Sequence, residues 1–152
     1  MKSVPTWFGR LLLGGWVPGP RYVDLVLTAV RVFTGLSLAF AHGWGKLLEP
    51  SGIIGMSRQM GLPLPMLAGW LAVLAEFVGG LLLAAGWLTR PAAFFIAVNM
   101  AVAAFGWHLL HAGDPYGEME HALLFLVIAV LFLAVGSGRF GVDRFLRRRP
   151  KA

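Results

Sequence analysis

Four long apolar stretches, separated by short polar breaks, dominate the pattern of hydrophobic and polar positions along this chain. They cover about residues 22–41, 67–88, 92–110 and 120–135. Each comes close to the roughly 20 residues that an α-helix needs to cross ~30 Å of hydrocarbon. Because short connections force neighbouring helices to run antiparallel, the pattern predicts an all-α integral membrane protein, an antiparallel four-helix bundle.

Proline and glycine mark the ends of the predicted helices. Residues 89–91, Thr-Arg-Pro, predict a tight turn between the second and third spans, and residues 113–117 separate the third span from the fourth. The longest connection, residues 50–65, carries apolar residues such as Ile53 and Met56 at helical spacing. That spacing predicts a short interfacial helix on the membrane surface, in the first extracytoplasmic loop.

The basic residues predict the orientation and divide the chain into three parts. Ten lysines and arginines flank the spans on the side of both termini, against two on the other side, so both termini are predicted to be cytoplasmic in a bacterial inner (plasma) membrane. Residues 1–21 form a predicted interfacial segment, 22–138 the membrane domain and 139–152 a basic tail. The net charge of +6 is thus a topology signal and a contact with membrane lipids, and no nucleic-acid partner is expected.

Composition limits the chemistry. The chain has 152 residues, 58% of them hydrophobic, and no cysteine. This length leaves no room for a soluble catalytic domain beside four spans, and the lack of cysteine excludes disulfides, thiol exchange and cysteine-ligated iron–sulfur clusters. Chemistry must therefore take place within the bundle or in a partner.

Three polar residues fall inside the predicted spans. At 1.5 Å per residue, Arg31, Glu76 and Asn99 each lie about 12 to 15 Å from the start of their span, close to the membrane midplane. Charged groups there are normally turned inward and paired, which predicts an ion pair between Arg31 and Glu76 with Asn99 beside it. The pair has two interpretations: it takes part in proton or quinone chemistry, or it only fixes the helix register.

A second group of polar residues lies at the opposite rim from the termini, and it includes all four histidines. Imidazole binds transition metals and exchanges protons near neutral pH, although histidines at the ends of helices are often only solvated. The rim residues are His42, Lys46, His108, His111, Glu118, Glu120 and His121. Four of them are weak candidates for metal ligands, namely His108, His111, Glu118 and His121, and no metal site is predicted.

The chain resembles the DoxX family of small four-span bacterial membrane proteins. The resemblance runs from about Arg31 to Asp143. Its motifs are Arg31-x-x-x-Gly35, His42-Gly43-x-x-Lys46-Leu47, Glu76-x-x-Gly79-Gly80, Thr89-Arg90, Asn99-Met100, Glu120-x-Ala122-Leu123-Leu124 and Gly136-x-Gly138-Arg139-x-x-x-Asp143. His121 departs from the family, which usually has an aromatic residue there.

The resemblance implies a redox role, since relatives are associated with thiosulfate:quinone oxidoreduction and with membrane oxidoreductase complexes. We therefore expect a quinone-linked subunit that works with a protein partner or as a homo-oligomer, and not a stand-alone enzyme. A membrane scaffold that recruits a soluble oxidoreductase, and a metal-handling or transport protein, are the alternatives. The candidate catalytic residues are Arg31, Glu76 and His42. The candidate residues for binding a quinone are Arg31, His42, Lys46, Glu76, Asn99, His108 and Glu120.

Overall fold

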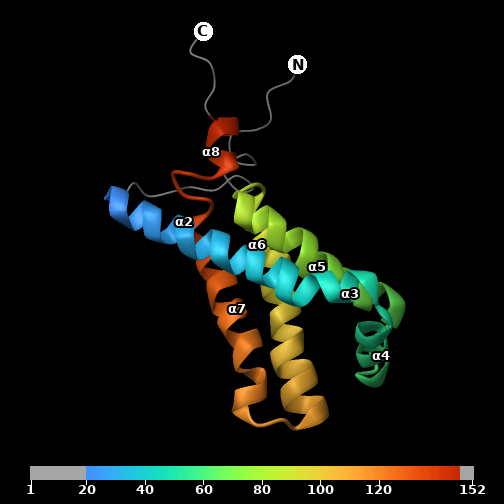
Figure 1. Cartoon of the computed structure of the whole chain (residues 1–152). Helices are drawn as coiled ribbons and strands as arrows, with labels where there is room; N and C mark the ends of the chain where they lie inside the picture. Colours follow the sequence, from blue (N-terminus) through green and yellow to red (C-terminus); the bar gives the residue numbers. More distant parts are fainter. Residues whose placement is uncertain (1–19, 148–152) are drawn as a thin grey trace.

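The computed structural model describes residues 20–147, and the only regular structure in this range is helical. Within residues 20–147, four helices are long and apolar enough to cross a membrane by length and composition, which confirms the predicted fold class (Figure 1). The elements are α2 (Arg21–Leu36), η1 (Ser37–Gly43), α3 (Trp44–Leu48), α4 (Ser51–Gln59), α5 (Pro65–Ala85), α6 (Thr89–Ala101), η2 (Val102–Ala112), α7 (Tyr116–Val135) and α8 (Val142–Arg147), where η marks a π-helix.

The first long helix extends well past its predicted end. The elements α2, η1 and α3 form one helix of 28 residues, Arg21–Leu48, and α6 continues into η2 as a second composite helix, Thr89–Ala112. At 1.5 Å per residue the first helix is about 42 Å long, more than the ~30 Å hydrocarbon core. A helix of that length fits by tilting, and α2 does cross α6 and α7 at a steep angle in Figure 1.

The turn between the second and third spans lies earlier than predicted. The helix α5 ends at Gly86, which has a φ of 69°, and α6 begins at Thr89. Thr89 to Pro91 therefore form the first turn of α6, because proline is tolerated where the backbone N–H has no partner within the helix. The break before α7 lies where it was predicted, with Gly113 at a φ of 66°.

Consecutive long helices run in opposite directions, and α6 lies beside α7 along most of its length (Figure 1). The short helix α4 packs against α5. A helix is thus present in the long first loop, as predicted, and its location at the membrane surface stays a prediction.

Glycine allows α2 and α5 to approach very closely. A Cβ atom on Gly35 would lie 2.5 Å from the carbonyl oxygen of Gly80, and one on Gly80 would lie 2.7 Å from the carbonyl oxygen of Gly35. Helices in lipid associate through such small residues, since no hydrophobic effect drives them together. This crossing sets the register between the first and second spans.

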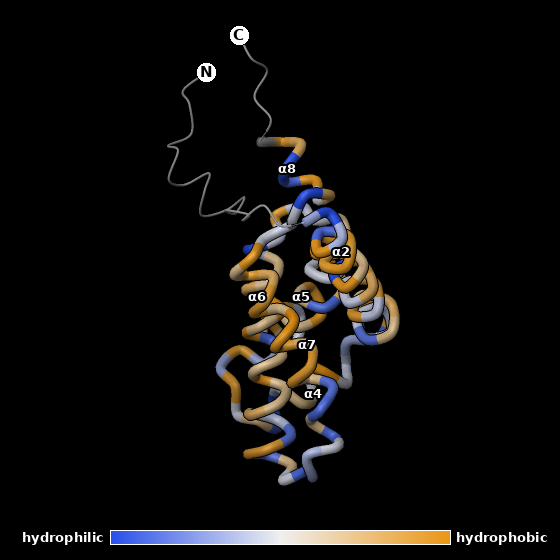
Figure 2. Tube along the Cα trace, turned by 90° about the vertical axis from the view of Figure 1, so that its left-hand side faces the viewer, coloured by the Kyte–Doolittle hydropathy of each residue, from blue (hydrophilic) through white to orange (hydrophobic). Residues whose placement is uncertain are grey.

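Large apolar side chains cover the outside of the bundle. Phe33 is 74% exposed and Val127 is 66% exposed, as expected of helices that contact lipid. Hydrophilic residues gather mostly at the two ends of the bundle (Figure 2). The interior contains a cluster of smaller apolar side chains from η1, α5, α6, η2 and α7: Leu38, Leu83, Ala93, Ile96, Ala97, Met100, Ala104, Met119, Ala122, Ala129 and Phe132.

Candidate functional site

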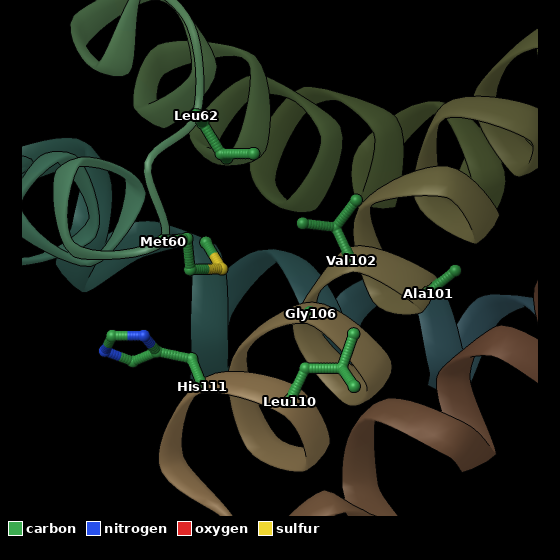
Figure 3. Close-up of a pocket in the computed structure, with 7 residues that line it drawn as sticks. All are labelled: Met60, Leu62, Ala101, Val102, Gly106, Leu110 and His111. Atoms are coloured by element: carbon green, nitrogen blue, oxygen red, sulfur yellow. The ribbon is translucent and has the colours of Figure 1, made fainter.

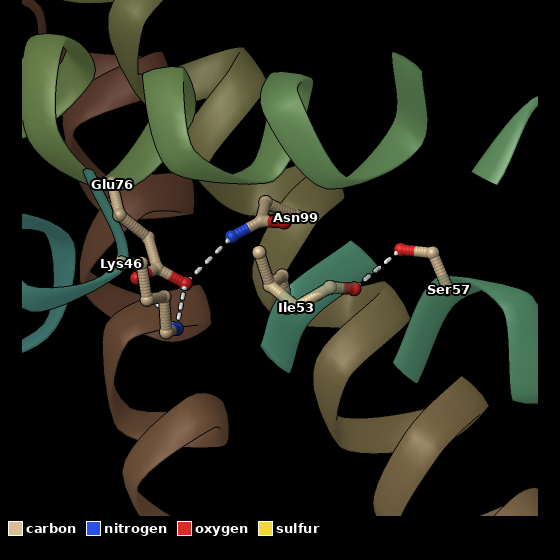
Figure 4. Close-up of polar contacts among 5 residues, drawn as sticks. All are labelled: Lys46, Ile53, Ser57, Glu76 and Asn99. Carbon is tan, nitrogen blue, oxygen red and sulfur yellow. Dashed lines mark hydrogen bonds and ion pairs between the residues drawn. The ribbon is translucent and has the colours of Figure 1, made fainter. Parts of the chain in front are cut away.

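Glu76, in the middle of α5, is a buried carboxylate held by two donors from other helices. Its side chain is 4% exposed, and Lys46 Nζ lies 2.6 and 2.7 Å from its two oxygens. Asn99 Nδ2 donates a hydrogen bond to Glu76 Oε1 at 3.2 Å (Figure 4). These three residues, from α3, α5 and α6, are called the Glu76 cluster below. Asn99 thus lies beside Glu76, as predicted.

Close packing of η1 against α5 brings Lys46 over Glu76. A Cβ atom on Gly43 would lie 2.7 Å from the backbone nitrogen of Phe77, so only glycine fits between the two helices there. Lys46 follows Gly43 by three residues, and its side chain is 36% exposed. The carboxylate is therefore buried, whereas the ammonium group that pairs with it lies at the edge of the bundle.

His42 lies close to the same cluster. Its ring packs edge to face on Phe125 of α7, with ring centroids 5.2 Å apart, and it is within electrostatic range of Glu76, Lys46 and His121. Four of the predicted site residues, His42, Lys46, Glu76 and Asn99, therefore meet in one region. Glu76 and Asn99 are predicted at the midplane, whereas His42 and Lys46 are predicted in a separate layer at the rim.

The predicted ion pair between Arg31 and Glu76 is wrong. Arg31 is 2% exposed, and its Nη1 donates to the carbonyl oxygens of Leu83, at 2.6 Å, and Ala84. These acceptors lie seven and eight residues beyond Glu76, a distance of about 11 Å along α5. The guanidinium therefore binds the C-terminal end of α5, where free carbonyls and the helix dipole favour a cation.

Asp143 is a buried residue that the sequence reasoning did not assign to any role. Its carboxylate accepts hydrogen bonds from the backbone N–H groups of Leu88 and Thr89, at 2.8 and 3.0 Å, and from Thr89 Oγ1 at 2.8 Å. Its own N–H donates to the carbonyl oxygen of Gly86 at 2.9 Å. Asp143 thus caps the N-terminus of α6 from a distant part of the chain.

A second ion pair links the first helix to the segment after the last span. Arg139 Nε lies 3.2 Å from Asp24 Oδ2, and the Asp24 side chain is 1% exposed. Arg90 Nη2 also donates to the carbonyl oxygen of Ala134 at 2.8 Å. The motif that ends in Arg139 and Asp143 was noticed in the sequence, but its partners lie too far away along the chain for spacing to reveal them.

The remaining histidines make local contacts near the turn that follows η2. His108 Nδ1 lies 2.8 Å from Asp114 Oδ2. The ring of His111 stacks on Trp107, with centroids 4.8 Å apart and an angle of 29° between the planes. His108 therefore has no contact with the Glu76 cluster among the interactions of the described residues.

The other rim residues are exposed at the start of α7, and they include Glu118, Glu120 and His121. The helix begins at Tyr116, so Glu118 and His121 do lie one turn apart, as considered in the sequence. Within residues 20–147, however, no three histidine, aspartate or glutamate side chains come together in a group suited to a metal ion.

The Glu76 cluster combines one proton acceptor with two hydrogen-bond donors in an apolar surrounding. Such a group can hold a proton, and the third N–H of the Lys46 ammonium can donate to the carbonyl oxygen of a ligand. Electrostatic interactions are strong there because little water screens them. Both composite helices become π-helical near the cluster, in η1 and η2, and π-helical turns are frequently found at functional sites.

Comparison with known proteins places the chain among bacterial membrane proteins. It is 35% identical over 128 residues to an uncharacterized protein of Haemophilus influenzae, covering 81% of this chain and 92% of the relative. It is 35% identical to the inner membrane protein YqjF of Escherichia coli over 127 residues, which cover 83% and 95% of the two chains. The inner membrane protein YphA of the same organism is 30% identical over 139 residues, which cover 82% and 96%.

No solved structure matches the chain. The DoxX family model matches residues 26–109, which include Arg31 and the whole Glu76 cluster. Since this match covers more than half of the chain, and the bacterial relatives are similar over nearly their whole length, the protein belongs to the DoxX family.

Proposed function

We propose that this protein is a quinone-linked subunit of an oxidoreductase complex in the bacterial inner membrane, and that the Glu76 cluster binds the quinone head group. The observation that carries the proposal is the convergence of two N–H donors, from Lys46 and Asn99, on a carboxylate that is only 4% exposed. A buried charge of this kind inside a membrane bundle is a candidate functional site by default.

The residues fit the chemistry of a quinone. A quinone carbonyl is a hydrogen-bond acceptor, and the Lys46 ammonium can supply a donor, because it has three N–H groups and two of them are directed at the Glu76 oxygens that hold it in place. The hydrogen bond from Asn99 Nδ2 to Glu76, at 3.2 Å, is longer than the most common distance. The Asn99 amide can therefore also donate to a different acceptor. Trp44 lies beside Phe77, with ring centroids 5.6 Å apart, and provides an aromatic surface on the neighbouring turn.

A bound quinone would supply the redox chemistry, taking up two electrons and two protons as it becomes a quinol. The protein's part is to orient the ring and to hold protons at defined atoms. The Glu76 carboxylate can accept a proton, and the His42 imidazole, one turn before Lys46 in the same helix and within electrostatic range of Glu76, can exchange protons with it.

We expect the electrons to come from a partner protein, since no cysteine is present to hold an iron–sulfur cluster or to form a redox-active disulfide. The positive charges near both termini support a topology with these ends in the cytoplasm, and two relatives carry the name inner membrane protein. The basic residues that follow α8 in the sequence are the segment that we propose recruits this partner.

The test is a titration of the purified protein in detergent with a short-chain quinone, monitored by quenching of tryptophan fluorescence. Glu76→Gln removes the charge that orients Lys46, so we expect binding to weaken by about tenfold or more, which corresponds to one charge-assisted hydrogen bond. Glu118→Gln, at an exposed carboxylate, is the matched control. Equal affinity in wild type and Glu76→Gln would contradict the proposal.

A further inference from the structure

An open groove of about 550 Å³ runs along η2, between this helix and the segment that joins α4 to α5 (Figure 3). Pockets of ~300 to 1,000 Å³ are typical of small-molecule sites. The lining is apolar apart from one imidazole and consists of Met60, Leu62, Ala101, Val102, Gly106, Leu110 and His111.

Gly106 lines the groove and places no side chain in it. A Cβ atom at this position would lie 3.6 Å from Met60 Sδ and 3.7 Å from Val102 Cγ1. Both are ordinary van der Waals distances, so a methyl group fits at position 106 without strain. A larger side chain would extend from the same point into the space between Met60 and Val102.

The π-helix determines which residues face the groove. Each π-helical turn closes with an i→i+5 bond and holds more residues than the 3.6 of an α-helix. Residues spaced by four and five, such as Val102, Gly106 and His111, therefore fall on one face of η2. Asn99 precedes Val102 by three residues, and side chains three apart on a helix are neighbours, about 5 to 6 Å apart at Cβ. The groove thus begins one turn beyond the Glu76 cluster.

We propose that this groove holds the isoprenoid chain of the quinone whose head group binds at the Glu76 cluster, an inference that rests on the proposed function. The groove lies in a helix long and apolar enough to span a membrane, so its occupant comes from the lipid phase. The six apolar residues that line the groove suit a hydrocarbon chain. Because the groove begins near Asn99, a quinone whose head group binds at the Glu76 cluster can place its chain there. His111, whose ring stacks on Trp107, also lines the groove.

The test compares two quinones with the same ring, one with a long isoprenoid chain and one with a methyl group in its place. Wild type should bind the long-chain compound at least about threefold more tightly, because van der Waals packing of the chain in the groove favours binding even when the chain leaves an apolar phase. Gly106→Phe fills the groove and should abolish this preference while short-chain binding stays the same. Gly106→Ala is the matched control and should keep both affinities.

A second variant, Val102→Phe, fills the groove from a neighbouring turn. It keeps the test available if Gly106→Phe does not fold. Helix content and melting temperature identify a variant that has not folded. A chain-length preference that survives in folded Gly106→Phe and Val102→Phe would overturn the inference and leave the proposed function intact. Loss of short-chain binding as well would mean that the ring itself lies in the groove, which also overturns it. Failure of wild type to bind either compound would refute the proposed function.

Discussion

Asp143→Ala is expected to destabilise the protein more than removal of any exposed carboxylate. The wild-type side chain is 1% exposed and accepts three hydrogen bonds, two from backbone N–H groups and one from Thr89 Oγ1. Alanine leaves these donors without a partner at a buried helix N-terminus, beside the buried guanidinium of Arg31, which feels the Asp143 charge.

The expected magnitude follows from these contacts. Loss of an N-cap costs about 0.5 to 2 kcal/mol, and each buried donor left unsatisfied costs about 1 to 3 kcal/mol. Because relaxation recovers part of this, we expect the free energy of unfolding to fall by about 3 to 5 kcal/mol. Asp143→Asn keeps one acceptor oxygen and should lose about 1 to 2 kcal/mol.

The assay is equilibrium unfolding in mixed detergent micelles, followed by circular dichroism. Asp114→Ala is the matched control, because Asp114 is 31% exposed and contacts only the His108 side chain among the ion pairs of the described residues, so its loss should cost about 0 to 1 kcal/mol. If Asp143→Ala and Asp114→Ala lower the free energy of unfolding equally, the assignment of Asp143 as a buried helix cap is refuted.

Three further predictions concern the helix crossing, the ion pair and the buried arginine. Gly35→Ala places a Cβ atom 2.5 Å from a backbone oxygen of α5 and should lower the free energy of unfolding by about 1 to 3 kcal/mol, whereas Gly45→Ala, with nothing within 4 Å, should not lower it. Lys46→Met leaves a buried carboxylate unpaired, so Lys46→Met alone should be less stable than the double variant with Glu76→Gln; additive effects in this double-mutant cycle would argue against the pair. Arg31→Gln should lower the melting temperature yet leave the affinity for short-chain quinone within about twofold of wild type, since the carbonyl groups that Arg31 binds lie about 11 Å from Glu76 along α5. A loss of affinity in the folded variant would show that Arg31 takes part in quinone binding.

Much of the fold could be predicted from the sequence because lipid imposes a strict rule on it. A chain that crosses hydrocarbon must satisfy its backbone within each helix, so four apolar stretches mean four long helices. Glycine and proline then indicate where helices break, as at Gly113. The turn near Thr89 was placed three residues too late, because proline in the first turn of a helix resembles a breaker in the sequence.

The partner of Glu76 could not be predicted from depth alone. Arg31 and Glu76 are predicted to lie at the same height because each lies near the middle of a stretch of about 20 apolar residues. The first helix is in fact 28 residues long, and its crossing with α5 at Gly35 sets a register in which Lys46 reaches Glu76. Apolar periodicity contains no information about this register, which follows from close contact between two glycine-containing helices.

The long-range contacts of the C-terminal segment could not be predicted from the sequence either. Asp143 caps a helix that begins 54 residues earlier, and neither spacing nor composition links the two. The π-helical segments Ser37–Gly43 and Val102–Ala112 could not be predicted either, and residues within them are not spaced at the 100° step of an α-helix.

The most direct test of the proposed quinone site is the quinone content of protein purified from quinone-replete membranes, measured by mass spectrometry after solvent extraction. Wild type and Glu118→Gln should retain about one quinone per chain, and Glu76→Gln should retain much less at equal helix content, because the Lys46 donor is no longer held over the site. Well-folded wild type without quinone, or equal quinone content in Glu76→Gln, would contradict the assignment of the Glu76 cluster as a quinone site.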